Sequence, residues 1–595
     1  MSHLNKNPEP TLTQRLKTHL VALSGSAGRY EHWVLMLLAI IVGTVAGYGA
    51  IGFYLLLGTI QEFLFGIDDT QLASASASIA WWKILLVPTL GGLIVGQLLR
   101  FMPNGRSHAV PHVIEAAALH DGKISLKHGT LSALIASLSL SFGASMGREG
   151  PVVHLGATLA SAITQKLKLT PAVARTLLGC GVAAAVSASF NAPIAGVFFA
   201  HEVIMGHYAL HAFTPIVIAA VAGTLISRAY LGEYPAFVLP DYAINTYWEF
   251  PAFFILGIVS AIVAVAFMAS LNKADKLDLA DKVPRWIQPA IGGLILGTIA
   301  LAFPQILSVG YEATSNALNG RYELWLLLSL IVLKIGATSL SMASGFGGGI
   351  FSPSLFIGAM TGGAAGIILG MISPELASDP GLYAIVGMGA VASSVLGAPI
   401  STTLIVFEIT GDYSVTIAVM IASAVSSLVS SHFYQNSAFF NQLANRGIRL
   451  EGGRATYLLK SVPVSRAMDK DFFTLCETEP LSRARELFIA NGGRKLFVTQ
   501  QSGAIAGVLT LHELPTDIFD EPSSRELTAG EICRDNPKFV KSTDALEVAL
   551  ALMESSGEHS LAVIDDPDLP IIVGVILYSD VLREYNRALL ESQGK

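Results

Sequence analysis

An arginine and a glutamate stand between two glycines in one of the most apolar parts of the chain. The stretch SMGREGPVVH covers residues 145–154, and its ionisable pair is Arg148 and Glu149. An ionisable residue inside an apolar membrane segment is costly and is a functional candidate by default. Two interpretations are open. Glu149 either controls access to an anion site at a helix start, or forms a structural ion pair with Arg148.

The prolines beside these glycines indicate what the site binds. Pro151 ends the stretch GREGP (147–151), and Pro353 ends a second break, GIFSP (349–353). Proline is favoured in the first turn of a helix, and helix N-termini carry unpaired amide N–H groups that bind anions without a full cation nearby. Such a site can hold a permeating anion and still release it. The carboxylate of Glu149 would compete with that anion until protonation released it.

The two breaks belong to an internal repeat. Residues 191–203 (NAPIAGVFFAHEV) are similar to residues 397–409 (GAPISTTLIVFEI), with a proline and a glutamate at the same spacing in each. Both segments follow a small-residue helix and a Gly-Pro break in the same order. Paired, broken apolar segments point to a binding site near the membrane midplane. Helix packing explains most of the small residues, but it does not explain irregular backbone that recurs in register.

The composition is that of a membrane protein with a charged tail. Of 595 residues, 52% are hydrophobic and 14% charged, and the mean hydropathy is +0.57. The net charge is −7, and charged residues concentrate after residue 450, without the basic runs that bind nucleic acid. The sequence offers neither a metal-ligand cluster nor a nucleophile–base pair, so an enzyme is not expected. Several apolar runs are long enough to cross a bilayer: they lie within 33–58, 84–99, 253–271, 290–303, 324–343 and 415–431.

Together these motifs resemble the CLC family of chloride channels and chloride–proton antiporters. The two breaks, the repeat segments and FEIT (407–410) match family motifs in order, and SHAVP (107–111) stands where the family has a Gly-Ser-Gly-Ile-Pro loop. The resemblance covers roughly residues 30–450. It implies a polytopic α-helical membrane protein with two inverted repeats, roughly 31–230 and 250–450, and with broken helices. It also implies a homodimer in a lipid bilayer with one anion pathway per subunit.

The resemblance assigns roles to residues in the breaks. Glu149 resembles the gating glutamate, and the backbone amides of Ile350 and Phe351 resemble ligands of the central anion. Chloride is the default ion, and nitrate and bicarbonate would suit amide donors as well. Further anion-binding candidates come from the first motif: Gly147, Arg148 and Gly150.

Two ligand positions depart from the family pattern. With the loop aligned on Pro111, His108 replaces the usual serine. It is expected to be an anion ligand or a pH-sensitive element, or else a loop histidine that caps a helix. The usual tyrosine near the end of the membrane domain aligns with Phe439, with Phe440 as the alternative. Either phenylalanine lacks a hydroxyl donor, so the anion would depend more on backbone amides.

The proton-acceptor position departs as well. Antiporters of this family often have Glu-Glu after the first repeat segment, the second glutamate being the internal proton acceptor. This chain has His201-Glu202-Val203, which aligns Glu202 with the structural glutamate and Val203 with the proton carrier. Valine does not titrate, so a passive voltage- or pH-gated chloride channel is favoured. A chloride–proton antiporter that uses His201 or water is the alternative, although neighbouring positions of an α-helix point about 100° apart.

A second repeat follows the membrane segment. Residues 455–520 and 525–590 each predict an amphipathic helix and strands that end in a helix start. They resemble a cytoplasmic α/β pair of cystathionine-β-synthase (CBS) domains. Such pairs can bind adenine nucleotides through a Ser or Thr and an Asp three residues later, and neither motif is complete here. The candidates are Thr510 and Glu513 in the first unit, and Leu577 and Asp580 in the second.

The role of the tail is left open between two alternatives. It is either regulatory or assembly-related, with adenine nucleotide as the one candidate ligand, or a folded cap without a ligand. No cofactor is required for transport. A nucleotide-sensing membrane receptor is a more distant alternative for the whole protein. The N-terminal segment 1–30 carries Lys6, Arg15, Lys17 and Arg29, and this basic charge places both termini in the cytoplasm, with the body in the cell membrane.

Overall fold

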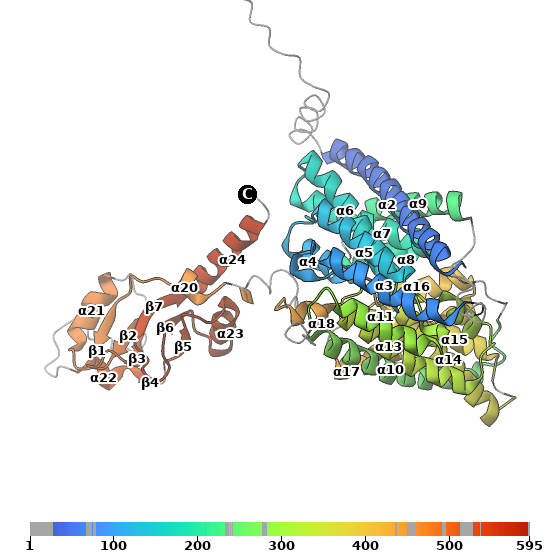
Figure 1. The fold of residues 1–595 in the computed structure, drawn as a ribbon. Coiled ribbons are helices and arrows are strands. Elements are labelled where there is room, and N and C mark those ends of the chain that lie inside the picture. The colour runs from blue at the N-terminus through green and yellow to red at the C-terminus, as the bar shows by residue number, and fades with distance from the viewer. Residues whose placement is uncertain are drawn as a thin grey trace, which may run out of the picture. The chain divides into compact units, whose positions relative to one another are not determined.

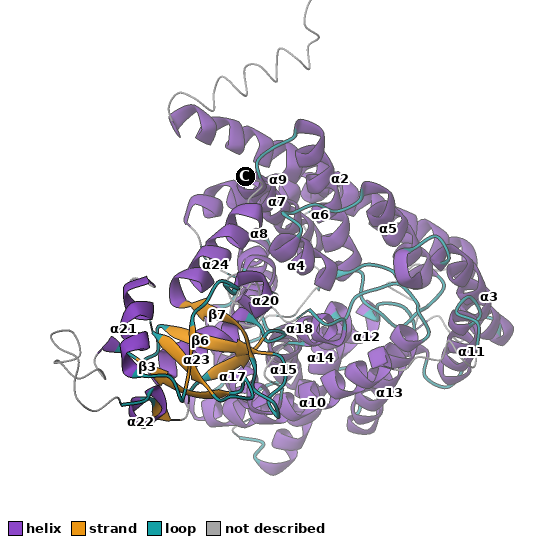
Figure 2. Cartoon of the chain, turned by 90° about the vertical axis from the view of Figure 1, so that its left-hand side faces the viewer, coloured by secondary structure: helices purple, strands orange, loops and turns teal. Residues whose placement is uncertain are grey.

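The chain divides into two units, Met1–Arg449 and Leu450–Lys595. Figure 2 shows that strands occur only in the second unit among the described parts of the chain. The computed structural model describes residues 28–66, 74, 79–206, 208, 210–232, 237, 240, 242–276, 283–375, 377–434, 437–448, 459–460, 462–490, 495–511, 527–535 and 537–592.

The first unit consists of two halves with the same order of helices (Figure 1). The first half contains α2 (Gly28–Phe65), α3 (Trp81–Leu99), α4 (Val110–Leu119), α5 (Leu126–Ser141), α6 (Glu149–Leu167), α7 (Pro171–Phe190), α8 (Pro193–Phe199), the π-helical turn η4 (Ala200–Met205) and α9 (Leu210–Leu231). The second half contains α10 (Phe250–Lys276), α11 (Gln288–Ala300), α12 (Tyr311–Leu318), α13 (Leu324–Ala343), α14 (Phe351–Ile372), α15 (Pro380–Leu396), α16 (Pro399–Thr410), α17 (Tyr413–Phe433) and α18 (Ala438–Asn445). Short 3₁₀ turns lie at Pro103–Gly105, Tyr247–Glu249 and Pro304–Ile306.

Eight helices in the described residues are long and apolar enough to cross a membrane. Five of the apolar runs of the sequence lie in such helices. The run 290–303 lies in α11 up to Ala300, and this helix has only 13 residues, which is shorter than a span. Three further spanning helices are not among these runs, because small residues or a proline interrupt their apolar sequence: Pro171–Phe190, His211–Leu231 and Phe351–Ile372.

The small-residue helices are buried on all sides. Every residue of α7 from Thr176 onward is buried, as is every residue of α15 after its first. A Cβ on Gly156 of α6 would stand 2.5 Å from the carbonyl oxygen of Gly181 of α7. In the other half, Gly358 and Gly387 make the same approach between α14 and α15, also at 2.5 Å. Small residues therefore let each broken helix pack closely on its enclosed neighbour.

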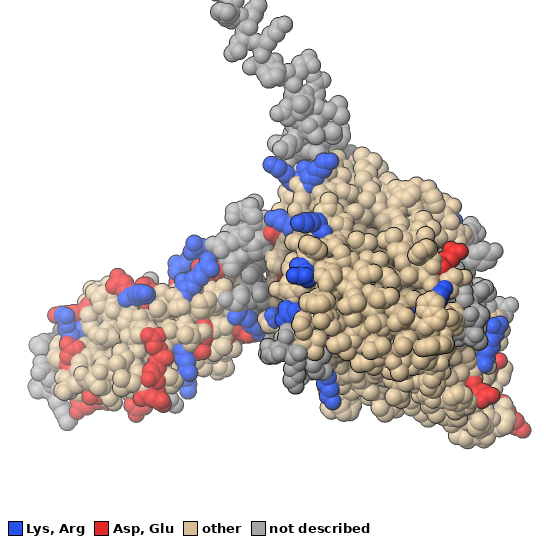
Figure 3. Space-filling view, in the orientation of Figure 1, with Lys and Arg blue, Asp and Glu red and all other residues tan. Residues whose placement is uncertain are grey.

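The outer surface of the first unit fits a bilayer. In Figure 3, Lys, Arg, Asp and Glu gather at two opposite ends of this unit and leave a broad uncharged band between them. Large apolar side chains are exposed on its helices, as with Leu225, Val332 and Leu428. Such an exposed apolar surface is expected where a protein faces lipid. The chain is thus an integral, multi-pass membrane protein.

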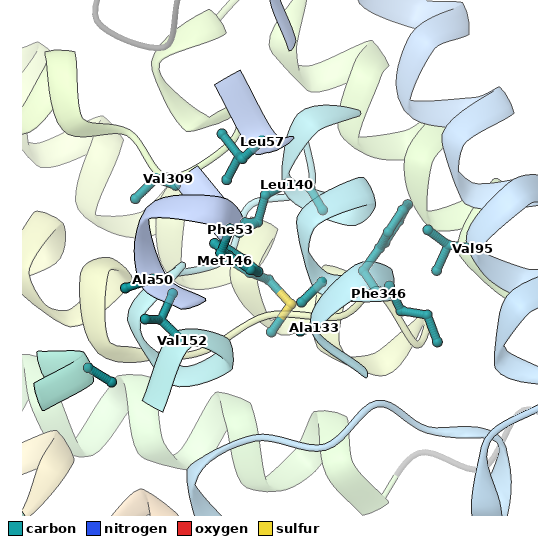
Figure 4. Close-up of a cluster of buried hydrophobic side chains, with 14 of the residues drawn as sticks. Ala50, Phe53, Leu57, Val95, Ala133, Leu140, Met146, Val152, Val309 and Phe346 are labelled. Carbon is teal, nitrogen blue, oxygen red and sulfur yellow. The ribbon is translucent and has the colours of Figure 1, made fainter. Parts of the chain in front are cut away.

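A hydrophobic cluster anchors the first break (Figure 4). Met146 precedes the break and Val152 follows it, and both are buried in this cluster with Phe53 of α2 and Leu140 of α5. Phe346, which precedes the second break, belongs to the same cluster. The irregular backbone of the first break is therefore held from both sides by packed apolar side chains, and that of the second break from its N-terminal side.

The second unit contains two similar α/β repeats. In the first sheet, β1 (Thr474–Cys476) is parallel to β2 (Leu496–Thr499), and β3 (Ile505–Leu509) and β4 (Arg534–Asp535) continue it antiparallel. In the second, β5 (Phe539–Lys541) is parallel to β6 (Ser560–Ile564), which is antiparallel to β7 (Ile572–Leu577). The helices are α20 (Val464–Ala467), α21 (Leu481–Ala490), α22 (Ala529–Ile532), α23 (Leu546–Ser556) and α24 (Tyr578–Ser592).

The segments that lead into these repeats are exchanged. Val464 of α20 packs in the core of the second sheet with Leu546 and Leu561. Ala529 of α22 packs in the core of the first sheet with Leu475. The repeat bounds predicted from the sequence, 455–520 and 525–590, place each of these segments in its own repeat and give no sign of this exchange. The two repeats therefore form one interlocked body.

Glu558 also ties the two repeats together. It follows α23 in the second repeat, and its carboxylate pairs with Lys495 and Arg534 beside the first sheet. Burial acts to raise the pKa of this carboxyl, but Lys495 and Arg534 outweigh burial and hold the pKa below its usual value. The ion pair therefore stabilises the fold above the ordinary glutamate pKa of about 4.3. That contribution is lost as the pH falls through the lowered pKa of the folded state.

Glu558→Gln is expected to loosen the contact between the repeats. At pH 7 the backbone amides of β2 and β6 in the full-length variant should exchange with deuterium faster than in wild type. The free energy of the opening that permits exchange should fall by about 1 kcal/mol, a figure that allows for solvent screening of the ion pair. The difference from wild type should shrink as the pH is lowered through the reduced pKa that Glu558 has in the folded state. Glu554→Gln, at an exposed position of α23, is the matched control. Equal exchange in the two variants would contradict a bridging role for Glu558.

Candidate anion-binding site

The two glycine breaks meet in the interior of the first unit. Gly147 and Gly349 exchange backbone hydrogen bonds, each amide donating to the other carbonyl at 2.7 Å. Gly150 lies against Gly349, and a Cβ on either residue would stand 3.0 Å from the Cα of the other. A side chain at these positions would separate the halves. The breaks thereby bring the N-termini of α6 and α14 together.

The start of α14 offers free amide donors. Ile350 is its N-cap and Phe351 its first residue. The first intrahelical hydrogen bond is donated by Ser354 to the carbonyl of Ile350, at 3.1 Å. The amides of Ile350 and Phe351 precede this bond and have no acceptor within the helix. They are therefore available to an anion, which is the role that the family resemblance implies for them.

A narrow cavity of about 70 Å³ reaches these helix starts. Of the predicted site residues, Gly150, Ile350, Phe351 and Phe439 line it. Those that do not line it are Gly147, Arg148, Glu149 and His108. Phe439 is buried at the cavity, which supports it over Phe440 as the aligned aromatic residue. The remaining lining residues are Arg106, Ser107, Ala109, Val110, Pro111, His112, Met146, Asp275, Met342, Gly345, Phe346, Gly348, Gly349, Gln442 and Arg446.

Glu149 bridges the two halves. It is the first residue of α6, and it is fully buried. The Tyr311 hydroxyl donates a hydrogen bond to its Oε1 at 2.7 Å, and the Ser352 hydroxyl donates to its Oε2. Ser352 directly follows Phe351, so the carboxylate lies beside the start of α14. The sequence reasoning missed both donors, because the hydroxyl within GIFSP was overlooked and Tyr311 lies outside every motif.

Arg148 is held away from the cavity. Its guanidinium lies over the ring of Tyr54 at 4.5 Å and over the ring of Tyr311 at 4.2 Å. Its Nε is 3.7 Å from Oε1 of Glu149. The ion pair of the structural interpretation is thus present. The cation–π contacts fix Arg148, and through Tyr311 they also fix a donor to the carboxylate.

His108 lies behind the cavity wall. Its ring stacks on His112 with centroids 4.0 Å apart and meets the edge of His154 at 5.5 Å. Its backbone amide donates to the Ser132 hydroxyl at 2.6 Å. The helix-capping role that the sequence suggested for His108 belongs instead to His112, whose Nδ1 accepts a hydrogen bond from the amide of Ala109 at 3.2 Å.

Two glutamates cap helices of the opposite half. Each accepts two amide hydrogen bonds of 2.8–3.1 Å from the first turn of a short helix. The donors are Ile400 and Ser401 of α16 for Glu202, and Ile194 and Ala195 of α8 for Glu408. A carboxylate at this position satisfies amides that the helix leaves unpaired. These contacts fit the structural role predicted for Glu202.

The residues on either side of Glu202 are enclosed. Val203 is buried, and the ring of His201 stacks between those of Tyr208 and Phe213, at 5.8 Å from each. All three positions of the HEV sequence belong to the π-helical turn η4. The angle of about 100° assumed for an α-helix therefore does not apply, because a π-helix has more residues per turn.

The candidate nucleotide residues of the tail are not brought into one cavity. Asp580 caps α24, since its Oδ2 accepts a hydrogen bond from the amide of Leu577 at 3.2 Å, and it pairs with Arg583. A cavity of about 40 Å³ within this unit is lined by Leu577, but by neither Thr510 nor Asp580. Glu513 lies outside the described residues.

Known sequences match both units. The family model described as voltage gated chloride channel matches residues 91–431, and the CBS domain model matches 464–514 and 529–587. A putative ClcB-like chloride channel protein of Ralstonia nicotianae is 31% identical over 407 residues, which cover 67% of this chain and 94% of that protein. The chloride channel protein CLC-f of Arabidopsis thaliana is 28% identical over 581 residues, with 93% of this chain and 69% of that protein covered.

Solved structures share the fold. A slow cyanobacterial Cl⁻/H⁺ antiporter has a TM-score of 0.62 at 24% identity and covers 69% of this chain and 97% of its own. A eukaryotic CLC transporter has a TM-score of 0.62 at 18% identity, covering 92% of this chain and 97% of its own. Together with the facing breaks and the reciprocal caps, these matches show that the chain is a member of the CLC family, with an inverted-repeat membrane fold and a C-terminal pair of CBS domains.

Proposed function

We propose that this protein transports chloride, or a similar small monovalent anion, through the cavity that ends at Ile350 and Phe351, with Glu149 as the gate. Membership of the CLC family and the chloride-channel names of its relatives support the substrate. The observation that carries the gate is the position of the Glu149 carboxylate. It is fully buried and accepts the hydroxyl of Ser352 beside the amides that would hold an anion.

The electrostatics of the site suit an ion that must leave again. Two helix N-termini converge on the cavity end, and their partial charges attract an anion without a full positive charge. Arg148 is fixed between two aromatic rings and does not line the cavity. Phe439 supplies no hydroxyl, so binding depends on amides. Moderate binding of this kind permits conduction.

The gate operates through competition. An ionised Glu149 keeps the donors Tyr311 and Ser352 and repels an arriving anion by its own charge. Protonation removes that repulsion and weakens both hydrogen bonds, because bonds to a charged acceptor are the stronger ones. The side chain can then leave the position beside α14, and an anion can take its place.

We further propose that transport is passive. A proton exchanged for an anion needs a titratable group on each side of the gate, and Val203 provides none at the aligned position. The second candidate, a chloride–proton antiporter, is favoured by one observation: His201 is a buried imidazole in the same π-turn, two residues before that position. Its stacking between Tyr208 and Phe213 argues against a free path from it to Glu149.

A homodimer with both termini in the cytoplasm completes the proposal. An apolar groove between α16 and α17, lined by Ile400, Leu404 and Met420 among others, suits a surface covered by a second subunit or by lipid. The molar mass of the detergent-solubilised protein from light scattering is expected to be that of a dimer.

The nucleotide site of the tail stays a prediction. To bind a ribose, Asp580 would have to release the hydrogen bond by which it caps α24.

Chloride efflux from proteoliposomes tests the transport activity. Vesicles loaded with potassium chloride should release chloride rapidly once valinomycin lets potassium follow, because a passive anion pathway moves charge. Protein-free vesicles of the same lipid are the control. Release no faster than from these vesicles, with chloride, nitrate and bicarbonate alike, would contradict the proposed function.

A further inference from the structure

A second polar pair lines the cavity apart from the helix starts. His112 lies in the first turn of α4, and Arg446 follows the end of α18. Nη1 of Arg446 is 2.7 Å from Nε2 of His112, and both residues line the cavity. Arg446 is exposed, whereas Ile350 and Phe351 are buried. The pair therefore stands at the outer end of the cavity.

The hydrogen-bond count of this pair does not balance. The amide of Ala109 donates to Nδ1 of His112, and Arg446 presents an N–H to Nε2. A neutral imidazole has one acceptor nitrogen and one N–H, and a guanidinium has donors only. Two donors therefore approach a ring that can accept from one of them. If Nδ1 is the acceptor, then Nε2 carries its N–H bond and faces an N–H of Arg446. The two nitrogens are 2.7 Å apart, and neither N–H has an acceptor in this contact.

An anion would satisfy every one of these groups. Lodged beside Arg446 and Nε2 of His112, it accepts both N–H bonds and leaves Nδ1 free to cap α4. The stack with His108 holds the ring of His112 in place. Neither ring needs to be protonated, since a neutral imidazole already supplies the Nε2–H donor.

The surrounding charges favour an anion. The charged side chains that line the cavity are Arg106, Arg446 and Asp275. Asp275 pairs with Arg106 at 2.7 Å, and its Oδ2 accepts a hydrogen bond from the side-chain amide of Asn445 at 3.1 Å. Glu115 of α4 also acts on Arg446, but it does not line the cavity. With the histidines neutral, the lining carries one net positive charge.

We propose that His112 and Arg446 form an entry site that holds a small monovalent anion before it reaches the amides of Ile350 and Phe351. The ligand rests on the proposed function, because it is the transported anion. One exposed cation and one neutral donor leave the ion partly hydrated. Release toward the helix starts therefore remains easy, as conduction through successive sites requires.

Anomalous diffraction from crystals of the full-length protein grown in bromide locates the ions directly. Density is expected within hydrogen-bond distance of both His112 Nε2 and Arg446 Nη1, separate from density at the amides of Ile350 and Phe351. Density at the amides alone would overturn the entry site and leave the proposed function standing. Density at the entry pair alone would support the entry site and count against the amide site.

Flux measurements provide the second test. In Arg446→Gln the chloride concentration for half-maximal efflux should rise about tenfold, as for the loss of one charge-assisted hydrogen bond, with maximal flux unchanged. His112→Phe keeps an aromatic ring for the stack and removes the donor, and it should act similarly. The double variant should resemble either single variant, because both residues hold the same ion.

Arg100→Gln is the matched control. Arg100 is exposed, donates to Gln97 at 3.1 Å and does not line the cavity. The control removes the same charge from the same unit and should leave the half-maximal concentration unchanged. An equal rise in Arg446→Gln and Arg100→Gln, or an additive rise in the double variant, would overturn the entry site. If the wild-type protein itself showed no chloride flux, the proposed function would be refuted instead.

Discussion

Glu149→Gln is expected to transport chloride at a high rate that no longer depends on pH. Glutamine cannot ionise, so the charge that repels an arriving anion is absent at every pH. The hydrogen bonds from Tyr311 and Ser352 become bonds to a neutral acceptor, which are weaker by roughly half. Glu149→Ala removes the side chain altogether and should give the same pH-independent flux.

The size of the effect depends on pH. Wild-type flux should rise with acidification, because protonation releases the carboxylate. At alkaline pH, where the wild-type gate is occupied, the variants should be faster by about tenfold or more, the effect of losing a hydrogen bond to a charged group. Chloride efflux from proteoliposomes between pH 4 and 9 measures this. Glu62→Gln, at an exposed position of α2, should behave as wild type.

Retention of the wild-type pH dependence in both Glu149 variants would show that Glu149 is not the gate. The histidine group of His108, His112 and His154 would then be the next candidate, because their rings are in contact beside the cavity.

Gly349→Ala is expected to lower anion flux about tenfold or more with the protein still folded. The new methyl group would stand 3.0 Å from both the Cα and the amide nitrogen of Gly150. These are backbone atoms, and Gly349 is itself fixed by two hydrogen bonds of 2.7 Å to Gly147. The contact is relieved only if the start of α14 moves away from α6. That displaces the amides of Ile350 and Phe351, and sub-ångström misplacement is enough to weaken hydrogen bonds to an ion.

The matched control lies in the same helix. Gly370 is near the other end of α14, where a Cβ would meet nothing within 4 Å. Gly370→Ala should transport as wild type. The elution profile and thermal unfolding of both variants check that they fold. Full flux in Gly349→Ala would mean that the close approach of the breaks does not set the anion site.

The paired breaks could be predicted from the sequence, because glycine and proline that interrupt an apolar segment indicate a break in a membrane helix. The structure has the expected helix start at Ile350 and Phe351, and the contacts of Glu202 with α16 fit the structural role expected for it. Membrane helices without a continuous apolar run, such as α7, were not recognised as spans by their apolarity, since burial inside the protein lets small and polar residues replace a lipid-facing surface.

Partners that lie far away in the sequence were not predictable. Tyr311 reaches Glu149 from the other half of the molecule, and no pattern around it marks this contact. The same holds for Arg446 and His112. For His108, the alignment on Pro111 identified a loop whose neighbouring residues, Ser107 and Ala109, line the cavity. Which of the loop side chains faces the cavity depends on the stacking of three imidazoles, and that packing appears only in the structure.

The passive pathway is tested most directly by following chloride and protons together in the same proteoliposomes, with a chloride gradient imposed and the membrane potential clamped. Chloride is predicted to run down its gradient while the internal pH stays constant, because Val203 leaves the inner side without the aligned titratable group. Sustained uphill proton movement coupled to chloride would contradict a passive pathway. Its disappearance in His201→Ala would then identify His201 as the inner proton acceptor.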